Sequence, residues 1–224
     1  MLKMFKICRN KRVLLLLVTQ LWVGPVLAGM LHVRVVGSDA RPVPNVVVFV
    51  QQNGSANINA GKPAAAIMDQ RDKQFAPHIL VVQKGAAVSF PNSDVIAHHV
   101  YSFSKLNRFI LPLYKGTLPD AVVFEHDGIV TLGCNIHDGM LAYIVVVDTD
   151  VFAKTNDDGR VELAVDDSAS SYEVSIWSPR IRDAKGHLVQ TLSGDAPGEM
   201  TFALEKKLRP AHIDRLESVA WDEY

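Results

Sequence analysis

The chain has 224 residues, of which 48% are hydrophobic, so it is long enough to bury one large core or two smaller ones. Its 23 Lys and Arg residues nearly balance its 24 Asp and Glu residues, for a formal net charge of −1. Without a basic excess, the composition argues against a nucleic-acid partner.

Residues 1–28 predict a secretory signal peptide. A basic start is followed by an apolar segment, and Val26 and Ala28 occupy the minus-three and minus-one positions of a small-residue cleavage site. The alternative is an uncleaved membrane anchor, but Gln20 and Pro25 interrupt the apolar segment. We therefore expect a periplasmic protein with no membrane span once the signal is removed. Cleavage also removes the basic residues of the signal peptide, so the remaining chain would be acidic.

The chain has two cysteines, and only Cys134 lies outside the predicted signal peptide. Exported proteins usually pair their cysteines in disulfides. A lone thiol in an oxidising compartment needs protection by burial or by a metal. The sequence thus excludes an intramolecular disulfide in the mature chain and favours a ligand role for Cys134.

The rest of the chain predicts β-structure. Residues 31–36 alternate in hydrophobicity, and the dense apolar run 46–50 predicts a strand buried on both faces. Residues 51–66 and 104–119 are predicted to be irregular, and the tail 209–224 a short surface helix or a frayed end. Short strands separated by turns indicate a sandwich or barrel. The other predicted strands are 79–83, 87–90, 99–103, 122–124, 129–132, 141–147, 160–165, 172–177 and 200–204.

The loop between the predicted strands 129–132 and 141–147 carries three potential metal ligands. Cys134, His137 and Met140 supply a thiolate, an imidazole and a thioether. One further histidine would complete the two-His, one-Cys, weak-Met set of a blue (type 1) copper site. Each residue alone could be an ordinary core or turn residue, but their joint occurrence at this spacing favours copper.

The pair His98-His99 offers the missing histidine. Neighbouring residues on a strand point to opposite faces of a sheet, so only one of the two can face the metal. We predict that His98 is the ligand. Zinc would accept Cys and His but takes Met poorly. A two-copper centre with bridging thiolates would need a second cysteine.

These residues predict an electron carrier rather than an enzyme. Four ligands leave no open position for a substrate, and the sequence contains no nucleophile motif such as Gly-x-Ser-x-Gly. We expect one type 1 copper bound by His98, Cys134, His137 and Met140, and a redox partner protein that docks transiently. The alternative is a non-redox copper-binding or β-sandwich accessory protein.

The central part of the chain resembles the cupredoxins. Cys134-x-x-His137-x-x-Met140 is similar to the short ligand loop of amicyanin-like members, and the stretch 90–100 is similar to the plastocyanin segment that contains a ligand His-Asn-Val. The wider run 75–148 resembles the bacterial group labelled methylamine utilization proteins. The resemblance implies a Greek-key β-sandwich with copper ligands at His98, Cys134, His137 and Met140, and electron transfer. Two departures are Gly139, where the group has a bulky aromatic residue, and Ser178, where it has His.

The flanks of this block resemble a carboxypeptidase-regulatory (transthyretin-like) β-domain. The resemblance rests on Pro-Val-Pro before an apolar strand near residue 46 and on Asp158-Gly159 before another strand. It implies a flanking β-domain made of residues 29–66 and 149–208, with a cupredoxin-like copper domain, 67–148, inserted between the two parts. The alternative is a single sandwich with extra strands.

Overall fold

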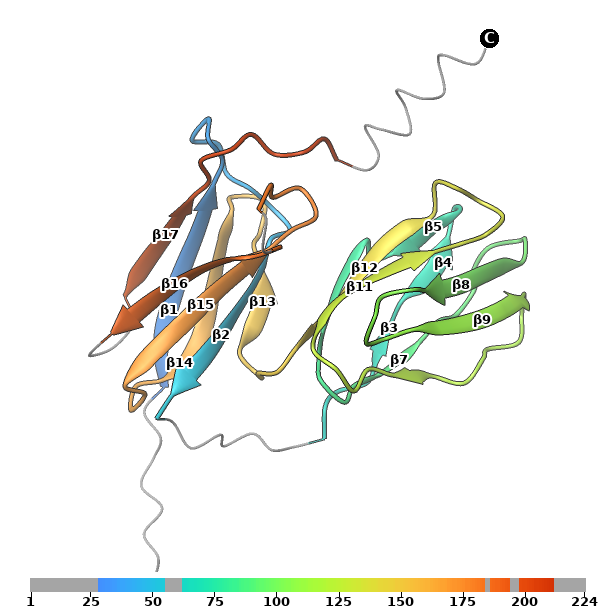
Figure 1. The fold of residues 1–224 in the computed structure, drawn as a ribbon, viewed down its shortest axis with the longest axis horizontal. Helices are drawn as coiled ribbons and strands as arrows, with labels where there is room; N and C mark the ends of the chain where they lie inside the picture. Colours follow the sequence, from blue (N-terminus) through green and yellow to red (C-terminus); the bar gives the residue numbers. More distant parts are fainter. Residues whose placement is uncertain (1–27, 55–61, 184–185, 194–197, 212–224) are drawn as a thin grey trace, which may run out of the picture.

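The computed structural model of the protein describes residues 28–54, 62–183, 186–193 and 198–211. The predicted signal peptide, apart from Ala28, and most of the predicted tail, 212–224, lie outside the described residues. Every helix or strand element in the described part of the chain is a strand, which confirms the predicted all-β class (Figure 1). Accordingly, this part holds no helix of the length and apolarity that a membrane crossing requires.

Strands from the two ends of the described chain form a first sandwich. Its three-stranded sheet has the order β14-β1-β17, and its four-stranded sheet has the order β13-β2-β15-β16. Alternation buries Leu31, Val33 and Val35 of β1 in the core between the two sheets. The strands are β1 (Ala28–Val36), β2 (Val47–Asn53), β13 (Phe152–Lys154), β14 (Arg160–Asp166), β15 (Ser171–Trp177), β16 (Leu188–Ser193) and β17 (Glu199–Ala203).

The middle of the chain forms a second sandwich. A five-stranded sheet of order β6-β12-β11-β8-β9 faces a three-stranded sheet of order β10-β7-β3. Phe90, Phe124 and Leu132 are among the fully buried residues of its core. The strands are β3 (Ala66–Ile67), β6 (Ile79–Gln83), β7 (Ala87–Ser89), β8 (His98–Ser102), β9 (Phe109–Tyr114), β10 (Val122–Val123), β11 (Gly128–Gly133) and β12 (Leu141–Val147), with a hairpin of β4 (Asp69–Arg71) and β5 (Gln74–Ala76).

The second sandwich lies between β2 and β13 in the chain, and Figure 1 shows the two sandwiches side by side. Each sandwich has its own cluster of buried hydrophobic residues. Because the flanking strands close around a separate core, we propose that they form a domain of their own. In this proposal residues 67–148 are an insertion between its two parts, 29–66 and 149–208.

A third apolar cluster joins the two sandwiches. It combines Val47 and Trp177 of the first sandwich with Ile79, Val145 and Val147 of the second. Val47 belongs to the apolar run 46–50, whose alternate residues Val46, Val48 and Val50 point instead into the core of the first sandwich. The prediction that the run 46–50 is buried on both faces is therefore confirmed. The Lys154 ammonium also crosses the junction and donates a hydrogen bond of 2.9 Å to the Ile79 carbonyl.

The prediction that residues 104–119 are irregular was wrong. Residues 104–119 contain β9, although Pro112 lies within this strand. The strand lies at the edge of its sheet, where one side of the backbone needs no partner and proline is tolerated. The prediction that residues 51–66 are irregular was also wrong at both ends, because β2 runs to Asn53 and β3 begins at Ala66.

Trp177→Ala is expected to lower the free energy of unfolding by about 3 kcal/mol, because it removes a large buried side chain from the junction. Trp177 is 6% exposed, and its ring lies 5.4 Å from the ring of Tyr143 across the two sandwiches. Guanidinium unfolding followed by circular dichroism measures the effect. Val95→Ala, at a position 81% exposed, is the control and is expected to change stability by less than about 0.5 kcal/mol. Equal stability of the two variants would show that the junction contributes nothing.

Candidate metal centre

Three of the predicted ligands come together at one end of the second sandwich. The Cys134 sulfur lies 3.9 Å from Nδ1 of His98 and 3.9 Å from Nδ1 of His137. One potential ligand atom from each of the three residues lies within 4.8 Å of the other two. His98 and Cys134 are buried and His137 is half-buried, so the cluster faces the protein core on one side and the surface on the other.

Neighbouring strands place the cysteine beside the first histidine. Cys134 follows β11 directly, and β11 pairs with β8 through Gly133 and Tyr101. The Tyr101 ring covers Gly133 so closely that a Cβ atom there would lie 2.7 Å from it. Because glycine allows this approach, β11 ends against the strand that begins with His98.

The loop after Cys134 brings in the second histidine and Met140. The Met140 backbone N–H donates to the His137 carbonyl at 3.0 Å and closes a tight turn before β12 begins. Met140 is 2% exposed and belongs to the same buried cluster as Cys134. The fourth predicted ligand is therefore buried in the same core as the thiol.

The two neighbouring histidines of β8 have different surroundings. His98 is fully buried and joins the cluster. His99 is half-buried, and its Nδ1 atom is among the buried nitrogens that have no hydrogen-bond partner within the described part of the chain. This difference follows from the opposite directions of successive side chains on a strand.

Asp94, to which the sequence assigned no role, contacts one of the predicted ligands. Nε2 of His98 lies 2.7 Å from Oδ2 of Asp94, on the side of the ring away from Cys134. Asp94 precedes His98 by four residues, but the intervening loop is not a helix, so the spacing alone did not indicate the contact. The side chain of Asp94 is 12% exposed.

The electrostatics keep Asp94 ionised and His137 neutral. Burial tends to raise the pKa of Asp94, but hydrogen bonds from Lys73, His98 and Asp72 outweigh it and lower the pKa. The pKa of His137 is lowered by partial burial and by electrostatic interaction with His98 and Lys73, against a smaller opposite effect of Asp94. A neutral imidazole is the form that binds a metal.

This donor set fits copper. A cysteine sulfur with two imidazoles, and a thioether close by, is the combination found at blue copper sites. Both histidines present Nδ1 to the sulfur, and the other ring nitrogen of His98 is occupied by a carboxylate. Metal-binding histidines commonly have such a partner, which fixes their orientation.

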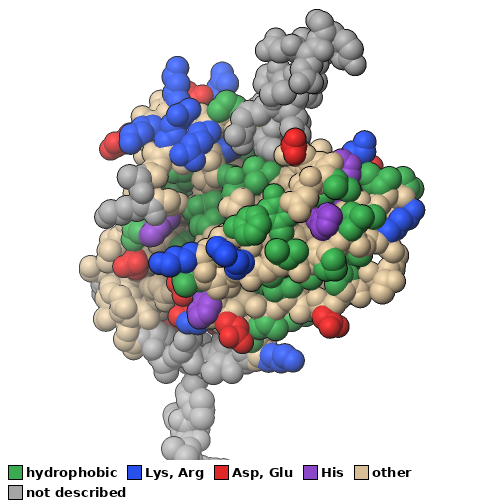
Figure 2. All heavy atoms as spheres, turned by 45° about the vertical axis from the view of Figure 1, so that its right-hand side comes forward, with side chains coloured by type: hydrophobic (Ala, Val, Ile, Leu, Met, Phe, Trp, Pro, Cys, Tyr) green, Lys and Arg blue, Asp and Glu red, His purple; other side chains and the backbone are tan. Residues whose placement is uncertain are grey.

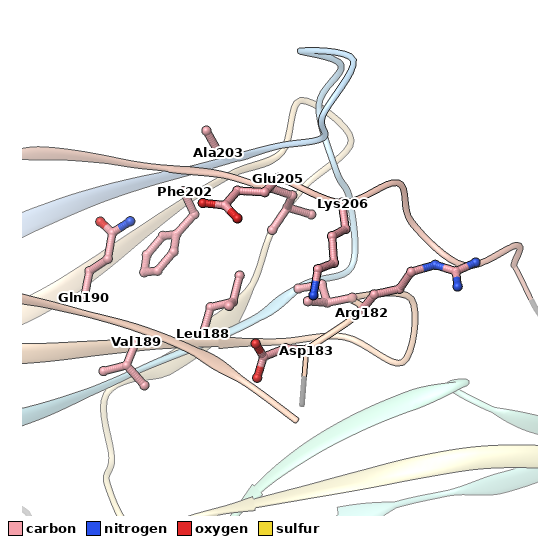
Figure 3. A pocket seen from close by; sticks show the side chains of 11 residues that line it. Arg182, Asp183, Leu188, Val189, Gln190, Phe202, Ala203, Glu205 and Lys206 are labelled. Atoms are coloured by element: carbon pink, nitrogen blue, oxygen red, sulfur yellow. The ribbon is translucent and has the colours of Figure 1, made fainter. Parts of the chain in front are cut away.

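Two of the cavities in the described part of the chain that lie away from this cluster are of similar size. One, of about 270 Å³, lies between the sandwiches and is lined by both Gly139 and Ser178, the two positions that depart from the cupredoxin-like group. The other, also about 270 Å³, lies in the first sandwich, where Arg182, Asp183, Glu205 and Lys206 line the same cavity as Leu188 and Phe202 (Figure 3). None of the four predicted ligands lines either cavity.

Comparison with known proteins gave structural likenesses only. No family model and no curated protein matches the chain. A point mutant of amicyanin in its reduced Cu(I) form is 18% identical over 45% of this chain and 98% of its own length, with a TM-score of 0.34. A second reduced amicyanin mutant is 20% identical with the same coverage and TM-score. The copper-containing nitrite reductase of Thermus scotoductus SA-01 is 21% identical over 50% of this chain, which spans 28% of that enzyme, with a TM-score of 0.36. Likenesses of this size assign neither a function nor a metal.

Proposed function

We propose that this chain is a cupredoxin-like copper protein that carries single electrons between redox partners. The observation that carries the proposal is the convergence of the Cys134 sulfur and the Nδ1 atoms of His98 and His137, which lie 3.9 Å from the sulfur. A cysteine sulfur and an imidazole from one loop meet an imidazole from strand β8 there, in a chain with no other cysteine after its predicted signal peptide.

In this proposal His98, Cys134, His137 and Met140 hold one type 1 copper ion, which supplies a one-electron couple. The protein contributes a donor set that changes little between oxidation states. His98 starts a paired strand, and Cys134 and Met140 stand at the two ends of a loop between paired strands β11 and β12. Backbone hydrogen bonds on both sides of the loop limit its movement. A small rearrangement on gain or loss of an electron favours fast transfer.

The surface around His137 suits brief docking. Ile136 is 50% exposed and Val95, next to Asp94, is 81% exposed. Apolar side chains make up much of the visible surface of the second sandwich, with scattered charges (Figure 2). Small apolar contacts of this kind are typical of transient redox encounters. We propose that a redox partner docks here, that the chain is not an enzyme, and that it acts in the periplasm.

Copper loading of the chain without residues 1–28 tests the proposal. We expect an intense visible absorption from the Cu(II)–thiolate bond, the EPR spectrum of a single type 1 copper, and a reversible couple in cyclic voltammetry. A colourless copper-loaded protein would contradict the proposed site. A coloured protein that shows no reversible couple, or that releases copper on reduction, would instead support a non-redox copper-binding role.

A further inference from the structure

The carboxylate of Asp94 is the meeting point of three hydrogen bonds. Oδ1 accepts the backbone N–H of Asp72 at 2.7 Å, and Oδ2 accepts the backbone N–H of Lys73 at 2.9 Å. Oδ2 also lies 2.7 Å from Nε2 of the fully buried His98. Because both backbone donors can only donate, the carboxylate must accept from them and is held in one orientation.

The hairpin of β4 and β5 supplies the two backbone donors. Its turn residues Asp72 and Lys73 have positive φ angles of 52° and 55°, a left-handed conformation that Asp adopts occasionally and Lys seldom. In this turn both N–H groups bind the same carboxylate. The observed backbone therefore holds Asp94 at some conformational cost, as is common at functional sites.

The hairpin is in turn fixed to the loop that carries Asp94. Gln70 of β4 makes two backbone hydrogen bonds to the loop. Its N–H donates to the Pro91 carbonyl at 3.1 Å, and its carbonyl accepts from the Ser93 N–H at 3.0 Å. The Asn92 amide nitrogen donates to the Ile96 carbonyl at 2.9 Å, within the same loop. The position of Asp94 is thus set by backbone contacts on two sides.

An ionised carboxylate at Nε2 determines which ring nitrogen of His98 carries the proton. Ionised Asp94 can only accept a hydrogen bond, so Nε2 must carry its hydrogen. In the neutral ring this leaves Nδ1, the atom that faces the Cys134 sulfur, with a free lone pair. We propose that Asp94, presented by the β4–β5 turn, is a positioning residue that holds His98 in its metal-binding tautomer and lowers the reduction potential of the bound metal.

The expected sign of the potential follows from charge. A negative carboxylate that is hydrogen-bonded to the imidazole ring of a metal ligand stabilises Cu(II), the more positive oxidation state, over Cu(I). It also raises the basicity of the imidazole, which strengthens binding of the more positive ion. Loss of the charge should therefore raise the potential and weaken Cu(II) binding more than Cu(I) binding.

Asp94→Asn tests the inference, which rests on the proposed copper site. Asparagine replaces one acceptor oxygen by a donor, so it cannot accept from both backbone N–H groups and His98 together. We expect at least a tenfold loss of Cu(I) affinity, measured by competition with a chromogenic chelator. We also expect the Cu(II)/Cu(I) equilibrium to shift at least tenfold toward Cu(I), which is a rise of about 59 mV in the potential for a one-electron couple.

Asp69→Asn is the matched control. Asp69 is a buried carboxylate of the same hairpin that accepts from Ser93 at 2.9 Å and from Arg71 at 2.8 Å, with no contact to a predicted ligand. The Asp69→Asn variant should keep the Cu(I) affinity and the Cu(II)/Cu(I) equilibrium within twofold of the wild type. Equal affinity and potential in Asp94→Asn, Asp69→Asn and the wild type, with the blue absorption present, would overturn the inference while leaving the proposed function intact.

A measurement on the unmodified chain covers the case in which Asp94→Asn does not fold. Long-range ¹H–¹⁵N NMR of the metal-free protein at alkaline pH reports the tautomer of each histidine. We expect His98 to carry its hydrogen on Nε2 and to show a slowly exchanging, downfield-shifted signal for it. A hydrogen on Nδ1 of His98 would overturn the inference whatever the metal measurements show.

Discussion

Cys134→Ser is expected to abolish the visible absorption of the copper-loaded protein while the fold persists. The band arises from charge transfer between thiolate sulfur and Cu(II), and serine has no sulfur to supply it. Cys134 is 4% exposed among apolar neighbours, so placing a hydroxyl there should cost only about 1–3 kcal/mol of stability. Absorption and EPR spectra of the loaded variant, with circular dichroism of the metal-free form, measure both effects.

The neighbouring histidines of β8 provide a control for this experiment. His98→Ala removes a fully buried residue of the cluster and should also abolish the blue spectrum. His99→Ala changes a half-buried residue outside the cluster and should retain it. A blue spectrum that survives in Cys134→Ser, or that depends on His99 and not on His98, would contradict the proposed ligand set.

Gly159→Ala is expected to destabilise the first sandwich by about 3 kcal/mol, through backbone strain and a steric clash. Gly159 has a φ angle of +68°, and a Cβ atom there would lie 2.5 Å from the Val35 carbonyl oxygen and 2.9 Å from the Val43 nitrogen. Both atoms belong to the backbone, so neither can move aside as a flexible side chain would. Urea unfolding followed by circular dichroism measures the loss.

Gly186→Ala separates the two causes of this loss. Gly186 also has a positive φ angle, +82°, but a Cβ atom there would meet no atom of the described residues within 4 Å. It should therefore show only the strain of a left-handed backbone, about 1 kcal/mol. If the two variants lose the same stability, the close approach at Gly159 has no energetic weight. Neither change should alter the blue spectrum, because both positions belong to the first sandwich.

The strands that the sequence predicted well are those with a strong apolar pattern. The predicted strands 79–83 and 141–147 coincide with β6 and β12, whose alternate residues enter different apolar clusters. The β4–β5 hairpin was missed because its strands contain Asp69, Gln70 and Arg71, and its turn has no glycine. Its stability comes from hydrogen bonds to the loop 91–94, which local patterns do not reveal.

The site was predictable to a similar extent. Cys134, His137 and Met140 share a loop, so their joint spacing indicated a metal site. Alternation along a strand limited the further ligand to one of His98 and His99, of which His98 was predicted. Asp94 could not be assigned a role in the same way. Its contact with His98 depends on how the loop between β7 and β8 folds back and on a hairpin turn more than 20 residues earlier in the chain.

The parallel pairing of β1 with β17 joins two strands that lie far apart in the chain, which leads to an expectation for the order of folding during synthesis. The first strand finds this partner only when residues 199–203 have been made, close to the end of the described chain. The second sandwich has all its strands once Val147 has emerged, and its contacts span shorter stretches of sequence. Short-range contacts form faster than distant ones. We therefore expect the second sandwich to form first, and the pairing of β1 with β17 to be completed later.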